Sequence, residues 1–219
     1  MKYNWTEIDY GHFFGCWEPD DKSVCDELIE FFHSCENIER MSGTIYNNQA
    51  GKAVIDKTQK NSTDLSISTQ YMHPTVNKYR EFLREVFRLY AAKFPASDMT
   101  APWNLTEPFN IQHYPPGGGF FSWHTERSGP GHPAVYRHLV FMTYLNDVEK
   151  GGETEFYHQQ VKIKPRKGHT LIWPSDWTYR HRGIAAPKED KYIATGWLDF
   201  VWVFWLSGLT NVTKRYILL

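Results

Sequence analysis

The stretch FNIQHYPPGGGFFSWHTE, residues 109–126, decides the fold class. FNIQHY and FFSWHTE are rich in aromatic residues, and PPGGG separates them as a turn would. The glycines lack the Lys-Ser/Thr of a phosphate-binding loop, and no helical pattern follows them. The stretch therefore predicts two strands joined by a turn.

The same texture continues toward the C-terminus. Short runs such as YRHLVFMTYLN, TEFYHQQVKIK and HTLIWP are separated by turn-forming segments such as DVEKGGE and PRKG. Closely spaced short strands of this kind are typical of an all-β sandwich or barrel. We expect this β region to form the core of the protein over residues 107–206.

The residues before this core, 1–106, read as a mainly helical and irregular support region. Residues 20–36 begin with acidic side chains and present one apolar face, as a helix on a core does. Residues 74–94 place aromatic and aliphatic side chains at helical spacing behind Pro74. At 219 residues the chain fits a single domain, with these helices packed on the sheet.

Composition excludes several classes of partner. The formal net charge is −1, so no charge excess attracts nucleic acid or an acidic membrane. Three cysteines without a C-x-x-C pair favour reduced thiols in the cytoplasm over a disulfide framework or a thiolate zinc site. The apolar run WLDFVWVFWLSG is too short for a membrane span and contains Asp199. No feature of the sequence specifies an oligomeric state.

A metal site is the first chemical hypothesis. His124 and Glu126 are two residues apart, so on an extended strand their side chains point to the same face. Alone, such a pair is more often two polar residues on a solvated strand. His181 adds a third ligand at the end of a late strand, where an antiparallel roll returns distant residues to one mouth. Two histidines and one carboxylate form the facial triad of non-haem Fe(II) oxygenases, which leaves positions open for further ligands.

Lys191 supplies a second signal ten residues after His181. Alternation along KYIATGWLDF places Lys191 on the same face as Ile193, Thr195 and Trp197. A lysine among apolar side chains is costly unless an anion pairs with it. The distal carboxylate of a 2-oxo dicarboxylate, chelated to iron by its keto-acid end, would be such an anion.

With these residues in place, the sequence over 108–200 resembles the prolyl 4-hydroxylase-like branch of the Fe(II)/2-oxoglutarate dioxygenases. The resemblance is carried by FNIQHYPPGGGFFSWHTE, YRHLVFMTYLNDVEKGGETEF, VKIKPRKGHTLIWP and HRGIAAPKEDKYIATGW. It implies a mainly β fold with α, a double-stranded β-helix (jelly-roll, cupin-like) with supporting N-terminal helices. It also implies that His124, Glu126 and His181 hold the iron and that Lys191 grips the distal carboxylate of 2-oxoglutarate.

Glu126 departs from the commonest pattern of this family, which has aspartate. Glutamate keeps the charge and the ligand type on a side chain one methylene longer, so we expect a shifted metal position or a withdrawn strand. A carboxylate at this place also argues against halogenation, because halogenases lack it and leave room for the halide.

The resemblance extends to residues around the cosubstrate. Tyr114 and Tyr144 match cosubstrate-contacting tyrosines, and Thr195 and Trp197 match positions that line the pocket. Arg137 matches an arginine near the substrate entrance. Simple alternation places Arg137 and Tyr144 on opposite faces, so both can face the pocket only if the strand contains a bulge or a break.

The implied reaction hydroxylates a C–H bond of a substrate, with Fe(II), 2-oxoglutarate, dioxygen and ascorbate as cofactors or cosubstrates, and releases succinate and CO2. Peptidyl proline in a peptide or protein is the expected substrate; a free amino acid or another small molecule stays open. A non-catalytic cupin-like metal-binding module and a zinc hydrolase are the remaining alternatives, although neither needs Lys191. We expect the glycine- and proline-rich loop 126–136 to form part of a substrate-gating lip.

Overall fold

The computed structural model describes residues 2–47, 51–128, 131 and 133–201. Its helices are α1 (Ser23–Ser34) and α2 (Pro74–Lys93), with short 3-10 turns η1 (Pro95–Asp98), η2 (Ala134–Tyr136) and η3 (Trp177–Tyr179). The strands, in chain order, are β1 (Trp5–Glu7), β2 (Gly15–Pro19), β3 (Arg40–Ser42), β4 (Ile45–Asn47), β5 (Lys52–Val54), β6 (Thr63–Ile67), β7 (Trp103–Asn104), β8 (Phe109–Tyr114), β9 (Arg137–Tyr144), β10 (Thr154–Phe156), β11 (Val161–Ile163), β12 (Thr170–Pro174), β13 (His181–Gly183) and β14 (Lys191–Phe200).

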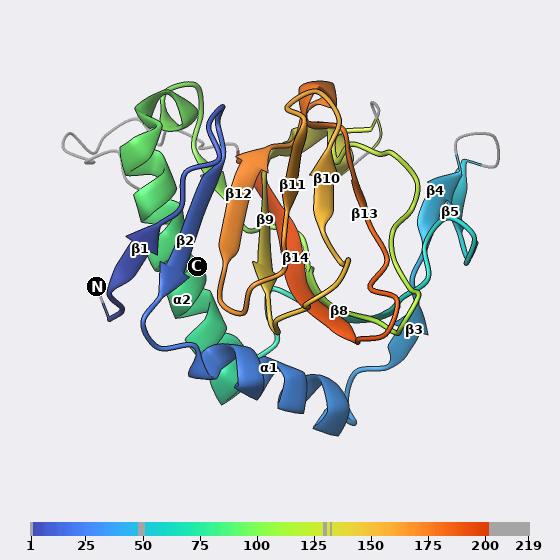
Figure 1. Cartoon of the computed structure of the whole chain (residues 1–219). Helices are drawn as coiled ribbons and strands as arrows, with labels where there is room; N and C mark the ends of the chain where they lie inside the picture. The colour runs from blue at the N-terminus through green and yellow to red at the C-terminus, as the bar shows by residue number, and fades with distance from the viewer. Residues whose placement is uncertain (1, 48–50, 129–130, 132, 202–219) are drawn as a thin grey trace.

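The strands form one large antiparallel sheet and one small sheet that faces it. The large sheet has the order β1-β2-β12-β9-β14-β8-β6-β3, and β7 pairs with β14 beside this path. The small sheet has the order β11-β10-β13 and lies in front of the large one in Figure 1. The hairpin β4-β5 projects to one side of this pair of sheets (Figure 1).

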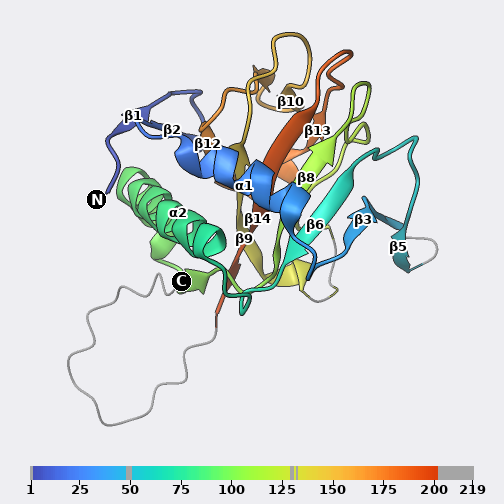
Figure 2. The same ribbon diagram turned by 90° about the horizontal axis from the view of Figure 1, so that it is seen from below.

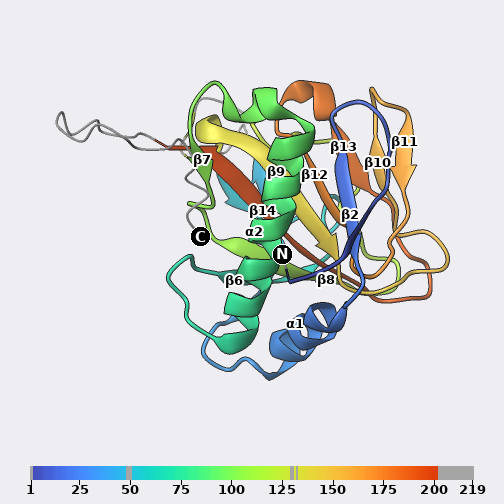
Figure 3. The same cartoon turned by 90° about the vertical axis from the view of Figure 1, so that its left-hand side faces the viewer.

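Both helices cover the same outer face of the large sheet, as Figures 2 and 3 show. The helix predicted over 74–94 is present as α2, where Tyr79, Phe82 and Phe87 are fully buried against the sheet. Pro74 opens α2 behind His73, whose side chain accepts a hydrogen bond from the Thr75 amide as an N-cap. The helix predicted over 20–36 is α1, shorter at both ends.

The inner face of the large sheet builds a second core against the small sheet. Along β9, Val140, Met142 and Tyr144 belong to this inner core, whereas Leu139 and Phe141 pack under the helices. This period of two is what a strand buried on both faces requires. The inner core leaves one end of the space between the sheets for polar side chains, and the candidate site lies there.

A bulge interrupts the pairing of β9 with β14. Leu198 pairs with Leu139, but the next residue, Asp199, pairs with Arg137, so that His138 is the extra residue. One extra residue turns the preceding side chain to the other face of the sheet. Arg137 therefore faces the inner side, the same side as Tyr144. The sequence had predicted that this arrangement needs a bulge or a break in the strand.

The N-terminal region contributes more β structure than the sequence predicted. Besides the two helices, it adds β1, β2, β3, β6 and β7 to the large sheet. Along β6 the sequence TDLSI places Leu65 and Ile67 in the core under the helices and Asp64 and Ser66 toward the cavity. This five-residue alternation is short, and the prediction of a mainly helical and irregular region overlooked it.

The predicted strand FFSWHTE is also not a regular strand. Within 120–126 the backbone makes only isolated bridges, Lys60 with Phe120 and His124 with His181. The segment is held instead by the chain just before β6: the Asn61 amide donates to Gly119, the Phe121 amide donates to Gln59, and the Ser122 hydroxyl donates to the Gln59 side chain. We call residues 119–126 the ligand arm.

The turn predicted over PPGGG is present. β8 ends at Tyr114, the Gly118 amide donates to the Pro115 carbonyl at 2.6 Å, and Gly117 has a φ of 78°. Such a φ favours glycine. Among the described residues, no helix is both long and apolar enough to cross a membrane. Most of the apolar run that ends at Gly208 lies outside the described residues.

Candidate active site

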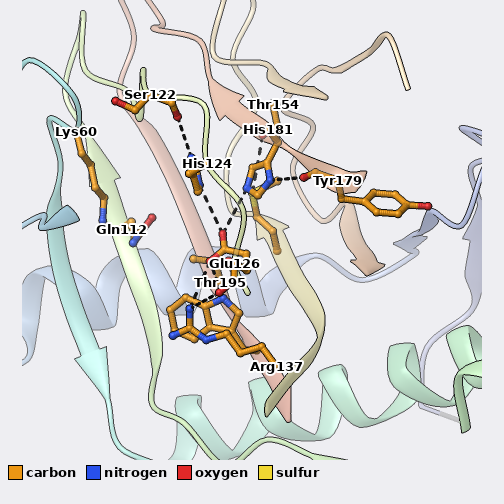
Figure 4. Close-up of polar contacts among 12 residues, drawn as sticks. Lys60, Gln112, Ser122, His124, Glu126, Arg137, Thr154, Tyr179, His181 and Thr195 are labelled. Atoms are coloured by element: carbon orange, nitrogen blue, oxygen red, sulfur yellow. Dashed lines mark hydrogen bonds and ion pairs between the residues drawn. The ribbon is translucent and has the colours of Figure 1, made fainter. Parts of the chain in front are cut away.

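Three side chains converge between the sheets at the end of the inner core. One ligand atom from each of His124, Glu126 and His181 lies within 4.8 Å of the other two (Figure 4). Oε1 of Glu126 lies 3.5 Å from Nε2 of His124 and 3.4 Å from Nε2 of His181. The ligand arm supplies the first two residues and β13 the third, and the backbone bridge between His124 and His181 joins the two segments.

The two imidazoles are oriented by backbone carbonyls. Nδ1 of His124 lies 2.9 Å from the carbonyl of Ser122, and Nδ1 of His181 lies 2.9 Å from the carbonyl of Tyr179. Each Nδ1 must carry a proton to donate to a carbonyl, so in the neutral imidazole the lone pair is on Nε2, the nitrogen that faces Glu126. This is the tautomer in which histidine binds a metal through Nε2. Phe120 stacks on the His124 ring at 3.7 Å between centroids and fixes its plane.

The electrostatics of this group favour a cation between the three side chains. Burial lowers the pKa of His124, and the neighbouring His181 lowers it further, although Glu126 acts in the opposite sense. Burial would raise the pKa of Glu126, but the interactions with the two histidines outweigh it and hold the pKa well below the usual range. Neutral imidazoles facing a carboxylate are the donor set that a divalent metal requires.

The spacing also fits an octahedral ion. Two neighbouring ligands about 2.1 Å from a metal lie about 3 Å apart. The separations of 3.4 and 3.5 Å are only slightly longer. The donor set therefore fits one six-coordinate ion with open positions on the cavity side.

The other carboxylate oxygen of Glu126 has partners of its own. The indole N–H of Trp197 donates to Oε2 at 2.8 Å, and Nη1 of Arg137 lies 3.7 Å from the same oxygen. The Arg137 guanidinium stacks on the Trp197 ring at 3.5 Å and forms a two-point ion pair with Glu107, at 2.7 and 2.8 Å. These contacts fix the longer side chain of glutamate with Oε1 toward the histidines.

Lys191 is a buried cation at the other end of the site. Lys191 is 3% exposed. Its Nζ donates to the Gly152 carbonyl at 3.1 Å and lies 4.7 Å from the centre of the Tyr114 ring. No carboxylate among the described residues lies within ion-pair distance of it. Burial lowers the pKa of Lys191 to about 8, although Glu153 acts in the opposite sense. A buried ammonium with one carbonyl partner has unused hydrogen-bonding capacity for an anion.

A polar network runs from Tyr114 to a second buried lysine. The Tyr114 hydroxyl donates to Oε1 of Gln112 at 2.7 Å, and the Gln112 amide donates to Asp64 at 3.1 Å. Asp64 also accepts from Nζ of Lys60 at 2.6 Å, so this lysine is already neutralised. Figure 4 shows Lys60 and Gln112 across the site from the His124 side chain. Of the two lysines that are buried in the described part of the chain, only Lys191 is left for an anionic ligand.

One cavity of about 1200 Å³ joins these groups. Lys191, Ile193, Thr195 and Trp197 all line it, as the alternation along β14 predicted. The wall continues onto the strands and loops of the N-terminal region, including the hairpin β4-β5, and is formed there by Glu39, Arg40, Met41, Ser42, Thr44, Ile45, Tyr46, Ala53 and Ile55.

The structure places the remaining predicted residues unequally. Tyr114 and Arg137 line the cavity, and Thr195 does so while its hydroxyl donates to the Phe141 carbonyl at 2.9 Å. Tyr144 lies behind the wall: its hydroxyl is hydrogen-bonded to the hydroxyl of Thr154, which lines the cavity, and to the Ile163 carbonyl. A direct contact of Tyr144 with a cosubstrate stays a prediction.

The predicted gating loop 126–136 is only partly described, since residues 129, 130 and 132 lie outside the described part of the chain. Within the described part, Arg127 donates to the Arg137 carbonyl and pairs with Asp176 at 3.0 Å, which fixes the start of the loop. A gating role for this loop stays a prediction.

Sequence reasoning missed several residues of the site. Gln112 lies two positions before Tyr114, so alternation along FNIQHY would have placed it on the same face. The sequence around Glu107 indicates only a turn. Its pairing with Arg137 depends on the bulge in β9, and no local sequence pattern predicts the position of that bulge. Lys60 and Asp64 come from a region without a recognisable motif; the alternation of TDLSI pointed to Asp64, and nothing local pointed to Lys60.

Comparisons with known proteins agree with this geometry. Residues 109–199 match the 2OG-Fe(II) oxygenase superfamily. "Probable prolyl 4-hydroxylase 9" of Arabidopsis thaliana is 34% identical over 122 residues, which cover 44% of this chain and 42% of that protein. "Prolyl 4-hydroxylase 13" of the same plant is 28% identical over 123 residues, 44% of each chain. The matched part thus spans less than half the length of both curated relatives.

Solved structures extend the likeness over nearly the whole chain. The 2OG complex of the viral collagen prolyl hydroxylase from Paramecium bursaria Chlorella virus-1 has a TM-score of 0.59 at 20% identity and covers 90% of this chain and 96% of its own. A Pseudomonas putida prolyl-4-hydroxylase has a TM-score of 0.61 at 16% identity, with coverages of 91% and 94%. A prolyl hydroxylase from Trichoplax adhaerens in complex with a hypoxia inducible factor peptide fragment has a TM-score of 0.62 at 18% identity. The match covers 82% of this chain and 78% of that one.

At these identities the solved structures establish the fold, and they confirm the predicted jelly-roll architecture. The family predicted from the sequence motifs is likewise confirmed by the superfamily match and the curated relatives. Residues 109–199 of this chain therefore match the 2OG-Fe(II) oxygenase superfamily, and the chain is similar to prolyl 4-hydroxylases.

Proposed function

We propose that this protein is an Fe(II)- and 2-oxoglutarate-dependent dioxygenase that hydroxylates peptidyl proline. One observation carries the proposal: a single cavity contains both three convergent metal-ligating atoms and a buried ammonium that has no carboxylate partner among the described residues. A metal-binding module without turnover would not need the second feature, and neither would a zinc hydrolase. A dioxygenase that binds a dicarboxylate needs both.

In this proposal His124, Glu126 and His181 would hold Fe(II), and Lys191 with Tyr114 would hold the distal carboxylate of 2-oxoglutarate. The bound iron and dioxygen supply the oxidation that converts 2-oxoglutarate to succinate and CO2 and inserts one oxygen atom into a substrate C–H bond. Ascorbate would serve as a reductant for iron. The residues of the chain bind and orient these groups.

The orienting contacts are built in before any ligand binds. The carbonyls of Ser122 and Tyr179 hold both imidazoles in the binding tautomer, and Trp197 holds Glu126. His181 is 6% and Lys191 3% exposed, so both side chains are shielded from bulk solvent. Preorganisation of this kind shortens the search for the reactive geometry.

The substrate assignment rests on the cavity and on the relatives. A volume of about 1200 Å³ exceeds what a small ligand alone requires, and the wall reaches the projecting hairpin β4-β5. The curated relatives are named prolyl 4-hydroxylases. Together these observations favour a proline within a peptide over a free amino acid or another small molecule.

The first test is anaerobic addition of Fe(II) and then 2-oxoglutarate to metal-free protein, followed by visible spectroscopy. We expect a weak charge-transfer band that requires both additions and is lost in Lys191→Ala at modest 2-oxoglutarate. A proline-containing peptide should then gain one oxygen atom under air, detected by mass spectrometry. Absence of the band at saturating additions would overturn the reaction; a band without peptide oxidation, but with oxidation of free amino acids, would overturn the substrate.

The cysteines support a compartment for this chemistry. Cys16, Cys25 and Cys35 are buried and unpaired, which suits a reducing compartment such as the cytoplasm. Fractionation of the source cells with an antibody against the full chain tests this placement, and recovery in a secreted fraction would contradict it.

A further inference from the structure

A continuous chain of polar contacts follows the cavity wall from one buried lysine to the other. Nζ of Lys60 lies 2.6 Å from Oδ2 of Asp64, and Figure 4 shows the Lys60 side chain pointing toward Gln112. Nε2 of Gln112 lies 3.1 Å from the same Asp64 oxygen, and Oε1 of Gln112 lies 2.7 Å from the Tyr114 hydroxyl. The Tyr114 ring in turn lies 4.7 Å from Nζ of Lys191. We call Lys60, Asp64, Gln112 and Tyr114 the polar relay.

Strand pairing places each member of the polar relay beside the next. Asp64 on β6 pairs with Gln112 on β8, and Lys191 on β14 pairs with Tyr114 on β8. Gln112 and Tyr114 are two residues apart on the same strand, so their side chains share its inner face. The polar relay is therefore fixed by the register of the large sheet and not by a loop.

The hydrogen bonds of the polar relay have one direction of donation. Asp64 accepts from the Lys60 ammonium and, at 2.7 Å, from the Ser62 hydroxyl, as an ionised carboxylate does. A carboxylate has no proton to give, so Gln112 must present its N–H group to Asp64 and its carbonyl oxygen to Tyr114. The single hydroxyl proton of Tyr114 is then donated to Gln112.

Burial makes this arrangement costly to break. Gln112 is 7% and Tyr114 4% exposed, so bulk water has little access to either group. If Tyr114 gave its proton to another acceptor, the Gln112 carbonyl would be buried without a donor. Rotation of the Gln112 amide is no remedy, because its oxygen would then face the Asp64 carboxylate. The Tyr114 hydroxyl therefore stays bonded to Gln112 when an anion enters the cavity.

We propose that Gln112 and Asp64 are positioning residues of the cosubstrate site: they commit the Tyr114 hydroxyl to Gln112 and hold the Tyr114 ring against the Lys191 ammonium. This inference rests on the proposed function and assigns the hydrogen bonds within it. Of this pair, Lys191 donates to the distal carboxylate of 2-oxoglutarate, and Tyr114 contributes its ring. An aromatic ring at this distance stabilises an ammonium, so the cation is held in place before the anion arrives.

The test compares Tyr114→Phe in two backgrounds, through the dissociation constant of 2-oxoglutarate measured anaerobically from the charge-transfer band of the Fe(II)-loaded protein. In the parent chain Tyr114→Phe should change the constant less than about twofold, because the ring stays and the hydroxyl does not bind the anion. Tyr114→Leu removes the ring and should raise the constant about tenfold. In Gln112→Leu the freed hydroxyl donates to the anion, so there Tyr114→Phe should raise the constant about tenfold.

Tyr79→Phe is the matched control, because it also removes a buried hydroxyl but lies in the core under the helices. It should leave the dissociation constant of 2-oxoglutarate unchanged. Fe(II) affinity should stay within about twofold of the parent in all these variants, a result that a general loss of structure would not give. A tenfold loss from Tyr114→Phe in the parent chain, or equal sensitivity in the two backgrounds, would overturn the inference.

A ligand-free measurement separates this inference from the proposed function. Urea unfolding of Tyr114→Phe, Gln112→Leu and the double variant should show a double loss smaller than the sum of the single losses, because each single variant leaves its partner unpaired. If no charge-transfer band forms in the parent, the proposed function fails, and non-additive unfolding alone upholds the polar relay. Additive losses would overturn the polar relay whether or not the cosubstrate binds.

Discussion

Trp197 and Glu126 are joined by a 2.8 Å hydrogen bond from the indole N–H to Oε2, the oxygen that faces away from the two histidines. The bond lets only one carboxylate oxygen face the metal position. It also explains how a glutamate can occupy a place where the sequence resemblance implied the shorter aspartate: the additional length is taken up by a fixed partner.

Trp197→Phe removes the N–H but keeps a ring under Arg137. We expect Fe(II) affinity to fall about 10- to 100-fold, as is usual when the partner of a metal ligand is lost. Anaerobic metal titration measures this. Trp173→Phe is the matched control, because Trp173 also packs on His181, while its indole N–H has no hydrogen-bond partner in the described structure. Equal losses in both variants would show that ring volume, not the hydrogen bond, matters.

The affinity for 2-oxoglutarate should depend on pH through Lys191. Burial lowers the pKa of this lysine to about 8 in the free protein. Below that pH the ammonium is present to pair with the distal carboxylate; above it, the dissociation constant should rise up to tenfold per pH unit, until the higher pKa of the complex is reached. Titration of the charge-transfer band between pH 7 and 9.5 measures this. In Lys191→Arg the dissociation constant should stay flat over that range, since arginine keeps its charge.

The same lysine should make the free energy of unfolding rise with pH, whereas it makes the affinity for 2-oxoglutarate fall. Its pKa is about 8 when folded and 10.5 in an unfolded chain, so the unfolded state binds more protons between these values. The contribution of Lys191 to the free energy of unfolding therefore rises with pH across that window. Urea unfolding of the ligand-free protein at pH 8 and pH 10, compared with Lys191→Met, isolates it; a fall with pH that disappears in Lys191→Met would contradict the assignment.

Gly183→Ala should weaken metal binding at least as much as cosubstrate binding. A Cβ at this position would lie 3.7 Å from Nζ of Lys191 and 3.2 Å from the backbone nitrogen of Phe120. The tight approach to the Phe120 backbone would shift the ligand arm that carries His124, whereas the contact with Nζ is ordinary van der Waals contact. Overpacking of the first kind costs about 1–3 kcal/mol. Gly131→Ala, which adds a methyl group into open space, serves as the control. Parallel titrations of Fe(II) and 2-oxoglutarate distinguish the two effects.

Tyr79→Phe should lower the free energy of unfolding by about 1 kcal/mol without changing Fe(II) affinity. The buried Tyr79 hydroxyl donates to Oγ1 of Thr143 at 2.9 Å, and Thr143 is itself paired with Thr170, so the bond ties α2 to the large sheet. Urea unfolding measures the loss. Tyr46→Phe, on a residue that is 62% exposed, should leave stability unchanged.

The sequence predicted what depends on short spacings. His124-x-Glu126 and the alternation from Lys191 to Trp197 follow from local geometry, and His181 follows from the way an antiparallel roll returns distant residues. The structure brings these residues to one cavity. The helix α2 was readable because its aromatic stripe has a helical period. The supporting contacts were not readable, because they join segments far apart in the chain.

Arg137 shows where local reasoning ends. The sequence required a bulge or a break for it to face the cavity, but nothing in YRHLVF specifies which residue is extra. The choice of His138 follows from tertiary packing: its ring stacks on Phe200 at 4.2 Å, and its Nε2 lies 2.9 Å from the Ser97 carbonyl. Lys60 and Asp64 were missed for a related reason, since their partners lie on β8 and the ligand arm.

The ligand arm has a consequence for how this protein can be divided. Its backbone is held by Gln59 and Asn61, which precede the segment shared with the superfamily. The stretch that relatives have in common is therefore not a self-sufficient module: excised at residue 109, it would keep every metal-binding side chain and lose the brace that aims His124. Grafting this chemistry onto another scaffold would require transplanting two discontinuous pieces: residues 109–199, and the segment with Gln59 and Asn61 that holds the ligand arm.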